Sequence, residues 1–392
     1  MKQRIYETIE SIKPADQQVL EKARKRQETL AKPPGSLGLL EEQSIRIAGM
    51  TGKVTNSIDR GCVAVFCADN GVAEEGVASA PQSVTMAQTV NFTRRVTGVG
   101  ALAKCFDSEL LIVDMGVKDP IPKELYVSKP LEDTHKILDR RIRPQTGQTG
   151  NIAKEDAMSR DEMFQAMTAG IEAANAIYAK GFSIMGVGEM GIGNTTTSAA
   201  LLSAITGESA DVTVGRGGGV NDAGFLRKKE IVNQVSRAYR QQGGILNSSR
   251  NQTARQRCDS MFQALSEMGG FDIAAMAGAY LGAASKRLPV VIDGYISVVA
   301  ALVASVIQPK AADYMIASHK SFERGYSLAV KVLGLQPFMA LEMRLGEGSG
   351  CPIAFEIIRG ACDVMANMAT FEEAAINDGY LEEIRSQEKY QR

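Results

Sequence analysis

The chain has 392 residues, 44% of them hydrophobic, and a formal net charge of -1 at pH 7, as expected for a globular protein with a substantial core. No apolar run reaches the roughly 20 residues that span a bilayer, and the N-terminal segment lacks the apolar centre of a signal peptide. Basic and acidic residues are balanced in number, and the sequence has no basic stripe, which excludes nucleic acid as a partner. We therefore expect a cytoplasmic protein with no membrane span.

The six cysteines are scattered without a CxxC pair, and only two histidines accompany them. This spacing predicts buried, reduced thiols and disfavours metal ligands and disulfides. We expect neither a metal nor a cofactor.

The first 50 residues have a polar, helical pattern that predicts two helices. They are separated at Lys32-Pro33-Pro34-Gly35-Ser36-Leu37-Gly38, because two prolines and two glycines forbid a continuous helix. Strands are expected at Cys62–Cys67, Leu110–Val113, Phe182–Met185, Ala210–Val214, Pro289–Ile292 and Ala312–Ile316. Helices are expected at Val84–Phe92, Ala101–Lys104 and Asp156–Lys180, with an exposed excursion over residues 118–148.

Alternating strands and helices predict an α/β fold with a mainly parallel, Rossmann-like sheet flanked by helices. Ligands bind such sheets at the carboxyl ends of the strands, where Gly, Asp and Ser loops of this chain would converge. The polar helical ends predict a small helical domain made of residues 1–58 and 361–392. Residues 59–360 would then form the large catalytic domain.

The most informative segment is Gly186–Thr197, which follows the apolar run Phe182–Met185. A strand that leads through glycines into a helix presents free backbone N–H groups to an anion, and the threonines add hydroxyl donors. Three readings remain open for it. The segment could hold a small phosphate ester, or it could be a plain capped turn. Its glycines, with Asp211 downstream, also fit the fingerprint of a nicotinamide-dependent oxidoreductase.

A second cluster, Gly346-Glu347-Gly348, surrounds one carboxylate with glycines and lets the backbone approach a ligand closely. A Glu in a partly apolar pocket, with Leu345 and Met190 as walls, would have a raised pKa suited to general-base catalysis. A solvated surface turn is the alternative. From the basic run Arg227-Lys228-Lys229, which otherwise faces water, one lysine could reach the same phosphate.

A hydrolase is disfavoured. Ser318 and His319 are adjacent and cannot meet across the two faces of a strand, and the chain has no GxSxG elbow.

Together these motifs resemble the nicotinate-nucleotide:dimethylbenzimidazole phosphoribosyltransferases of cobamide synthesis, over nearly the whole chain. The resemblance rests on Lys32–Gly38, Asp69-Asn70-Gly71-Val72 with Glu75-Gly76-Val77, Gly188–Thr196, Val214-Gly215-Arg216-Gly217, Ser318-His319-Lys320-Ser321 and Leu345-Gly346-Glu347-Gly348. It implies a dimer that moves 5-phosphoribose from nicotinate mononucleotide to an aromatic base and inverts the sugar carbon. Relatives also activate phenols, and some work as paired, non-identical subunits, so a homodimer and a heterodimer both stay open.

The resemblance also implies roles for individual residues. Glu347 matches the general base and Glu189 a second active-site carboxylate. Donor-binding positions are Gly191, Gly193, Asn194, Thr195, Thr196, Gly217, Lys228, Asp293 and Ser321. Acceptor-binding positions are Ser79, Met86, Ala87, Met190 and Leu345.

The acceptor region departs from the family pattern, with Asn70 where the family commonly has His and Ala78-Ser79-Ala80-Pro81 where an aromatic is usual. At Ala87-Gln88-Thr89 we expect an amide to be missing from the base-binding region. Such a site would be looser and would accept another benzimidazole, a purine or a phenol. The departures also suit a noncatalytic or co-catalytic subunit of a heteromeric enzyme.

Overall fold

The computed structural model describes residues 1–242 and 253–381, and its centre is a seven-stranded sheet in which every described strand pairing is parallel. The strand order is β3-β4-β2-β1-β5-β6-β7. The strands are β1 (Gly61–Ala68), β2 (Glu109–Gly116), β3 (Tyr126–Val127), β4 (Ile137–Asp139), β5 (Ile184–Met190), β6 (Val290–Ile292) and β7 (Met315–Ala317). The predicted α/β class with a parallel, Rossmann-like sheet is confirmed.

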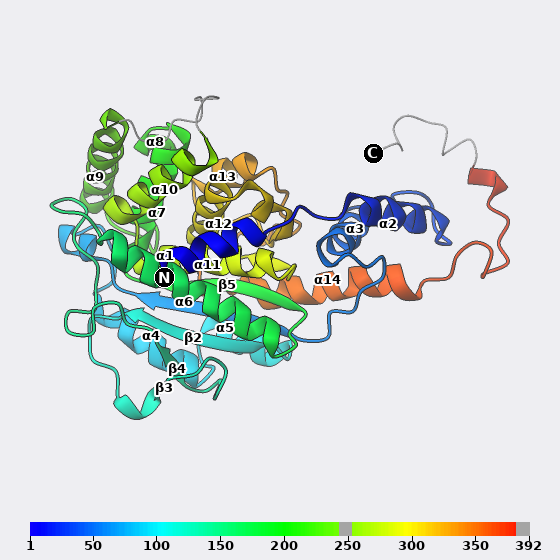
Figure 1. Cartoon of the computed structure of the whole chain (residues 1–392), viewed down its shortest axis with the longest axis horizontal. Helices are drawn as coiled ribbons and strands as arrows, with labels where there is room; N and C mark the ends of the chain where they lie inside the picture. The colour runs from blue at the N-terminus through cyan, green and yellow to red at the C-terminus, as the bar shows by residue number, and fades with distance from the viewer. Residues whose placement is uncertain (243–252, 382–392) are drawn as a thin grey trace.

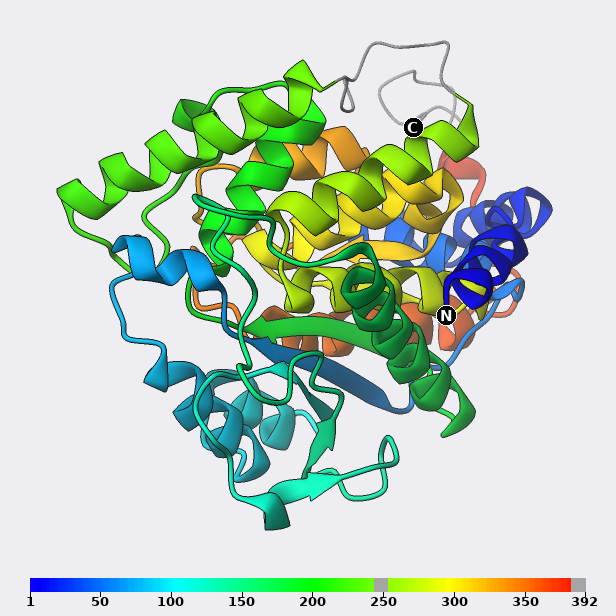
Figure 2. The ribbon, with the colours of Figure 1, turned by 60° about the vertical axis from the view of Figure 1, so that its left-hand side comes forward.

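Helices lie on both sides of this sheet (Figures 1 and 2). The α-helices are α1 (Lys2–Ser11), α2 (Gln17–Thr29), α3 (Leu39–Thr51), α4 (Ser83–Thr93), α5 (Gly98–Cys105), α6 (Arg160–Ala179), α7 (Asn194–Thr206), α8 (Ala210–Thr213), α9 (Asp222–Gln241), α10 (Ala254–Met268), α11 (Phe271–Ser285), α12 (Tyr295–Ile307), α13 (Tyr326–Leu333) and α14 (Gly350–Asn367). Short 3₁₀ helices are η1 (Gly71–Glu75), η2 (Lys123–Leu125), η3 (Pro309–Tyr314) and η4 (Gly379–Leu381).

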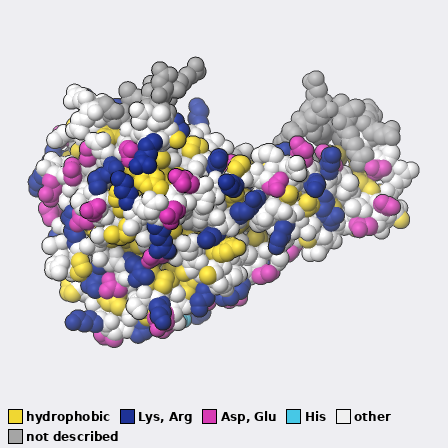
Figure 3. Space-filling view, in the orientation of Figure 1, with side chains coloured by type: hydrophobic (Ala, Val, Ile, Leu, Met, Phe, Trp, Pro, Cys, Tyr) yellow, Lys and Arg dark blue, Asp and Glu magenta, His cyan; other side chains and the backbone are white. Residues whose placement is uncertain are grey.

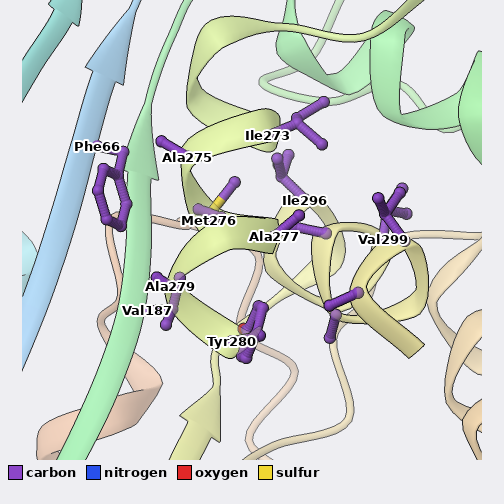
Figure 4. Close-up of a cluster of buried hydrophobic side chains, with 14 of the residues drawn as sticks. Phe66, Val187, Ile273, Ala275, Met276, Ala277, Ala279, Tyr280, Ile296 and Val299 are labelled. Atoms are coloured by element: carbon purple, nitrogen blue, oxygen red, sulfur yellow. The ribbon is translucent and has the colours of Figure 1, made fainter. Parts of the chain in front are cut away.

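Two neighbouring residues of β5 show how the layers are built. A Cβ at Gly186 would lie 2.5 Å from Cβ of Cys351, so the strand packs directly on α14. Val187 points to the opposite side, toward Ala279 and Tyr280 of α11 (Figure 4). Because successive side chains of a strand point to opposite faces, α14 and α11 cover the two faces of the sheet.

Helix α11 is buried almost all round, with α12 and the sheet packed against it (Figure 4). Its small residues allow α6 to approach very closely. A Cβ at Gly170 would lie 1.8 Å from the carbonyl oxygen of Ala275, and one at Gly278 would lie 2.0 Å from that of Met167. A helix that is apolar on every side is typical of the centre of a large protein.

Helices α2 and α3 and the last turns of α14 extend as an arm from one side of the body (Figure 1). They have a small core of their own, formed by Ala23, Ile45, Ala48 and Met365. Helix α1 lies instead on the body, against α6 and α11. We propose that the small domain consists of this arm, with its C-terminal part beginning inside α14.

Several predicted elements are corrected by the structure. Residues Ala210–Thr213 form the short helix α8 and no strand, because Asp211 and Val212 face solvent and a buried strand could not carry them there. The N-terminal region contains an additional helix break at Pro14, after which Asp16 caps α2 by accepting from Gln18 and Val19.

The C-terminal helix and the excursion also differ from expectation. Helix α14 begins at Gly350, earlier than the predicted helical tail at residue 361, whose last part falls outside the described residues. The strand expected at Ala312–Ile316 is mostly the 3₁₀ helix η3, which starts at Pro309, and β7 begins only at Met315. Residues 118–148 contribute β3 and β4 to the edge of the sheet, because Ile137 and Leu138 are buried there.

All six cysteines are free thiols, and only Cys105 is exposed. Lysine and arginine side chains are interspersed with acidic ones on the face shown in Figure 3. In the part of the chain that the structure describes, no helix is long and apolar enough to cross a bilayer. The cytoplasmic location stays a prediction of the sequence.

Candidate active site

A cavity of about 320 Å³ opens where the chain leaves β5, β6 and β7. This is the edge of a parallel sheet at which ligands are expected. Most of the residues predicted for the site line it, namely Ser79, Glu189, Met190, Gly191, Gly193, Asn194, Thr195, Gly217, Asp293, Ser321, Leu345 and Glu347. The structure therefore brings together two glycine-flanked acids and a helix N-terminus that are distant in the sequence.

One side of the cavity collects hydrogen-bond donors at the start of α7. Gly193 precedes the helix with φ of 99°, a left-handed conformation that favours glycine. Nζ of Lys228 donates to Oγ1 of Thr195 at 2.7 Å, and burial lowers the pKa of this lysine to about 8. A Cβ at Gly217 would lie 3.0 Å from Oγ1 of Thr195 and 3.4 Å from Nζ of Lys228. A helix N-terminus, a hydroxyl and an ammonium are groups that attract an anion, so this side of the cavity is a candidate anion site.

Two predicted donor-site residues lie behind this surface. Lys228 does not line the cavity itself and reaches it through Thr195. Thr196 is fully buried in the first turn of α7, and among the described residues its hydroxyl has no hydrogen-bond partner. The basic run thus contributes one lysine inward, while Lys229 pairs with the exposed Asp211 at 2.7 Å.

Glu347 lies on the other side, in a left-handed loop. Gly346, Glu347 and Gly348 have φ angles of 86°, 63° and 88°. For a residue with a side chain this conformation costs about 1–2 kcal/mol. A Cβ at Gly188 would lie 2.3 Å from the carbonyl oxygen of Glu347, so glycine in β5 allows the loop to approach.

Glu347 is only 4% exposed, and its carboxyl group has hydrogen-bond partners within the protein. Oε2 accepts from the backbone N–H of Val99 at 3.1 Å, and Oε1 accepts from Nε2 of Gln88 at 3.2 Å. Burial raises the pKa of Glu347, and these hydrogen bonds oppose the rise. A carboxylate with a raised pKa beside a cavity is suited to accept a proton near neutral pH.

Glu189 belongs to a group of buried acids. Nδ2 of Asn194 donates to Oε2 of Glu189 and to Oδ2 of Asp272, the latter at 3.0 Å. Burial, with Asp272 close by, raises the pKa of Glu189 to about 8, and burial raises that of Asp272 to about 6. The single amide therefore holds two carboxyl groups, of which Glu189 is the one more readily protonated at neutral pH.

Asp293 anchors the loop of Glu347. Its Oδ1 accepts from the N–H of Gly350 at 2.7 Å and its Oδ2 from that of Gly348 at 3.0 Å. Burial raises the pKa of Asp293 to about 7, and these two bonds oppose the rise. The neighbouring His319 is buried, which lowers its pKa to about 4, so its ring is neutral at pH 7.

The structure divides the residues predicted for the acceptor into two groups. Ser79, Met190 and Leu345 line the cavity, whereas Met86 and Ala87 do not. Val84 and Gln88 line it instead, because α4 turns residues four apart toward the same side. The expected loss of an amide is wrong, since Gln88 supplies one directly to Glu347. A count of four residues along the predicted helix from Val84 would have identified Gln88.

Three further polar residues at or near the cavity were not predicted from the sequence as site residues. Asp272 lies at the start of a helix whose pattern is otherwise apolar, and no motif marks it. Glu323 lines the cavity close to Lys228, and burial raises its pKa. His319 lines it too, although only Ser321 was predicted from this motif; its Nδ1 lies 3.0 Å from Oγ of Ser318, so the expectation that these two side chains cannot meet is wrong.

The dinucleotide fingerprint is not supported by the geometry. Gly186 and Gly188 lie inside β5, where they make room for α14 and for the loop of Glu347, and do not form a turn after the strand. Asp211, the expected ribose ligand, is an exposed residue of α8 paired with Lys229. The oxidoreductase alternative is therefore wrong.

Comparison with known proteins identifies the family of the chain. A family model described as phosphoribosyltransferase matches residues 12–376. The nicotinate-nucleotide–dimethylbenzimidazole phosphoribosyltransferase of Clostridium perfringens is 46% identical over 386 residues, covering 98% of this chain and 99% of the relative. The protein of the same name from Clostridium tetani is 40% identical over 382 residues, which cover 97% of this chain and 98% of the relative.

A solved structure agrees. The crystal structure of the Thermus thermophilus protein of the same name superposes with a TM-score of 0.80 at 34% identity, covering 93% of this chain and 100% of that one. With the buried glutamate and the anion site facing one cavity, this full-length similarity shows that the chain belongs to the nicotinate-nucleotide–dimethylbenzimidazole phosphoribosyltransferase family.

Proposed function

We propose that this protein transfers 5-phosphoribose from nicotinate mononucleotide to a ring nitrogen of dimethylbenzimidazole or a closely similar base in cobamide synthesis, and releases nicotinate. The names of the relatives provide the two substrates. The observation that carries the proposal is that Glu347 and the anion site at Thr195 line the same cavity. The phosphate of the donor and the N–H proton of the acceptor base can therefore both be bound in this cavity.

The donor side would bind the 5′-phosphate. The positive end of the α7 dipole, the hydroxyl of Thr195 and the ammonium of Lys228 are groups of the kind that phosphate prefers. The N–H groups of Asn194 and Thr196 already donate to the carbonyl oxygens of Gly191 and Gly193. Gly217 leaves space beside them for a phosphate oxygen. Ser321 and Asp293 lie along the cavity, where the ribose would extend from the phosphate toward Glu347.

The transfer needs one proton acceptor and no covalent intermediate. Glu347 takes the N–H proton of the base while a nitrogen of the base attacks C1′ of the ribose from the face opposite nicotinate. The C1′–N bond to nicotinate breaks, and its electron pair neutralises the positive ring nitrogen of the leaving group. Positioning two substrates in one enclosed site supplies much of the acceleration. The product is therefore inverted at C1′.

Glu189 would act as the second carboxyl group. Its raised pKa, about 8, favours the protonated form near neutrality. A protonated carboxyl group can donate a hydrogen bond to a substrate oxygen without adding negative charge to the cavity. Its Oε1 lies close to the backbone of Gly346, where a Cβ would be 2.5 Å away, so it borders the loop of the proposed base.

The proposal is tested by incubating the purified protein with nicotinate mononucleotide and dimethylbenzimidazole and measuring nicotinate and the riboside phosphate by liquid chromatography and mass spectrometry. Adenine, phenol and p-cresol complete the acceptor panel. We expect the benzimidazole to be used best, because the relatives are named for it. Absence of nicotinate release with every acceptor would refute the proposal.

We also propose that the protein is a dimer, as the resemblance implies. Leu345, Phe322 and Leu341, on the segments that border the cavity, are 60%, 64% and 53% exposed. The two segments are neighbours, since the N–H of Phe322 donates to the carbonyl oxygen of Met343, and apolar side chains gathered in this way can be covered by another chain. Light scattering of the isolated protein decides between a monomer and a homodimer.

A further inference from the structure

Glu75 joins three segments of the chain, although the reaction proposed above gives it no role. Its Oε1 accepts from Nδ2 of Asn151 at 2.8 Å and lies 3.0 Å from Nζ of Lys154. Its Oε2 pairs with Nη2 of Arg227. Hydrogen bonds from Arg227, Asn151 and Lys154 lower the pKa of Glu75 to about 2, so the side chain is charged.

The partner Arg227 precedes Lys228, whose ammonium reaches the anion site, on helix α9. A second contact joins the same two segments. A Cβ at Gly224, in the first turn of α9, would lie 2.5 Å from the carbonyl oxygen of Gly76. The end of η1 and the beginning of α9 are thus held together by an ion pair and by close backbone packing.

The segment that follows Glu75 forms a wall of the cavity. Val77, Ala78, Ser79 and Ala80 all line it. A Cβ at Gly218 would lie 3.1 Å from Oγ of Ser79, so this wall contacts the glycine loop beside Lys228. Residues before Glu75 contact the phosphate side as well, because a Cβ at Gly193 would lie 3.4 Å from the backbone nitrogen of Ala73.

We propose that the Glu75–Arg227 ion pair is a positioning element that couples the donor-phosphate site to the acceptor wall, so that binding of one substrate favours binding of the other. The inference rests on the proposed function, because that function places the two substrates on these two surfaces. Breaking the pair removes the ion pair by which Glu75, at the end of η1, holds Arg227 of α9. The wall at residues 77–80 and the helix that carries Lys228 are then held together by packing alone, which fixes their relative position less strictly.

The test compares Glu75→Gln, Arg227→Ala and the double variant in steady-state assays of nicotinate release. We expect each single change to raise KM for nicotinate mononucleotide and KM for the base together, by about fivefold, and to change kcat by less than about twofold. The double variant should be no worse than either single one, because both remove the same interaction. Arg227→Lys, which keeps the charge, should recover most of the loss.

Two matched controls separate coupling from general damage. Lys229→Ala removes the neighbouring cation, which pairs with Asp211, and Lys154→Ala removes a different partner of Glu75. Both should leave the two KM values near wild type, with thermal midpoints measured for every variant. A rise in only one KM, additive effects in the double variant, or equal effects of the controls would overturn the proposal.

A failure of the proposed function can be told apart from a failure of the coupling. Absence of nicotinate release from the wild-type protein refutes the function alone. Calorimetry then measures whether nicotinate mononucleotide lowers the Kd of the base, which needs no turnover. Coupling that is present in the wild type and lost in Arg227→Ala supports the inference, and equal Kd values in both proteins refute it.

Discussion

The backbone N–H of Val99 donates a 3.1 Å hydrogen bond to Oε2 of Glu347, which places the carboxylate at the N-terminus of helix α5. A helix N-terminus stabilises negative charge, whereas burial opposes it. The burial effect is the larger, and the pKa of Glu347 is raised. The two effects together produce a carboxylate that stays oriented and can still take up a proton.

Replacing Glu347 with Gln should slow nicotinate release by roughly 10² to 10⁴, because the amide keeps the shape but cannot accept the proton. Initial rates at saturating substrate measure the effect. Glu342→Gln, at an exposed position of the same segment, is the matched control and should have wild-type rates. Unchanged turnover in Glu347→Gln would remove this residue from the mechanism.

Replacing Lys228 with Met should weaken donor binding. The variant lacks the buried ammonium, whose hydrogen bond to Thr195 is 2.7 Å long, and with it the positive charge behind the proposed phosphate site. We expect KM for nicotinate mononucleotide to rise about 10- to 100-fold, the equivalent of roughly 1.5–3 kcal/mol. KM for the base should change much less.

Lys229→Met is the control for this prediction, since that lysine points to Asp211 at the surface. If both lysine variants raised KM for the donor equally, the effect would come from the net charge of the helix. The anion site at Thr195 would then lose its support.

The donor half of the site could be predicted because its chemistry is local in the sequence. Glycines that open a helix and the threonines that follow are adjacent residues, and the strand before them is an uninterrupted apolar run. Asp272 could not be found in this way. It touches the site only because α11 packs under the sheet and brings it to Asn194, a contact between residues 78 positions apart.

The fold shows the same division. Strand β1 was predictable because a strand buried on both faces must be apolar throughout. Helix α8 was missed because its short run can form either element, and only the exposure of Asp211 and Val212 decides. The side of α4 that faces the cavity depends on how that helix is rotated, which is why Gln88 was not recognised.

Gln88→Leu should lower kcat/KM about tenfold, because it removes the hydrogen bond that holds Oε1 of Glu347. Ala87→Val changes the preceding residue of the same helix, which is exposed and does not line the cavity. It should leave kcat/KM close to wild type. A larger loss in the Ala87 variant would show that the acceptor base binds on the other side of α4.

Glu189→Gln should change how stability depends on pH. The folded-state pKa of Glu189, about 8, lies above its ordinary value of 4.5, so the folded protein holds a proton that the unfolded chain releases. The wild type therefore loses stability as pH rises from about 4.5 to 8. The amide has no such proton, and the variant should gain on the wild type by about 3–4 kcal/mol between pH 5 and pH 8.

Urea unfolding of both proteins at the two pH values measures this difference. Lys228 does not disturb the comparison, because its lowered pKa of about 8 affects stability above that pH and is common to both proteins. Parallel pH profiles of the two proteins would show that Glu189 is ionised in the folded state throughout. Its role as a protonated hydrogen-bond donor would then be excluded.

Gly170→Ala should destabilise the protein by about 2–4 kcal/mol, because the new methyl group would lie 1.8 Å from the carbonyl oxygen of Ala275 and force α6 away from α11. Gly360→Ala is the matched control in another helix, where a Cβ meets nothing within 4 Å. That change should stabilise the protein by about 0.5–1 kcal/mol through helix propensity. Thermal and urea unfolding measure both. Equal effects would mean that close contact between α6 and α11 does not limit the stability of the core.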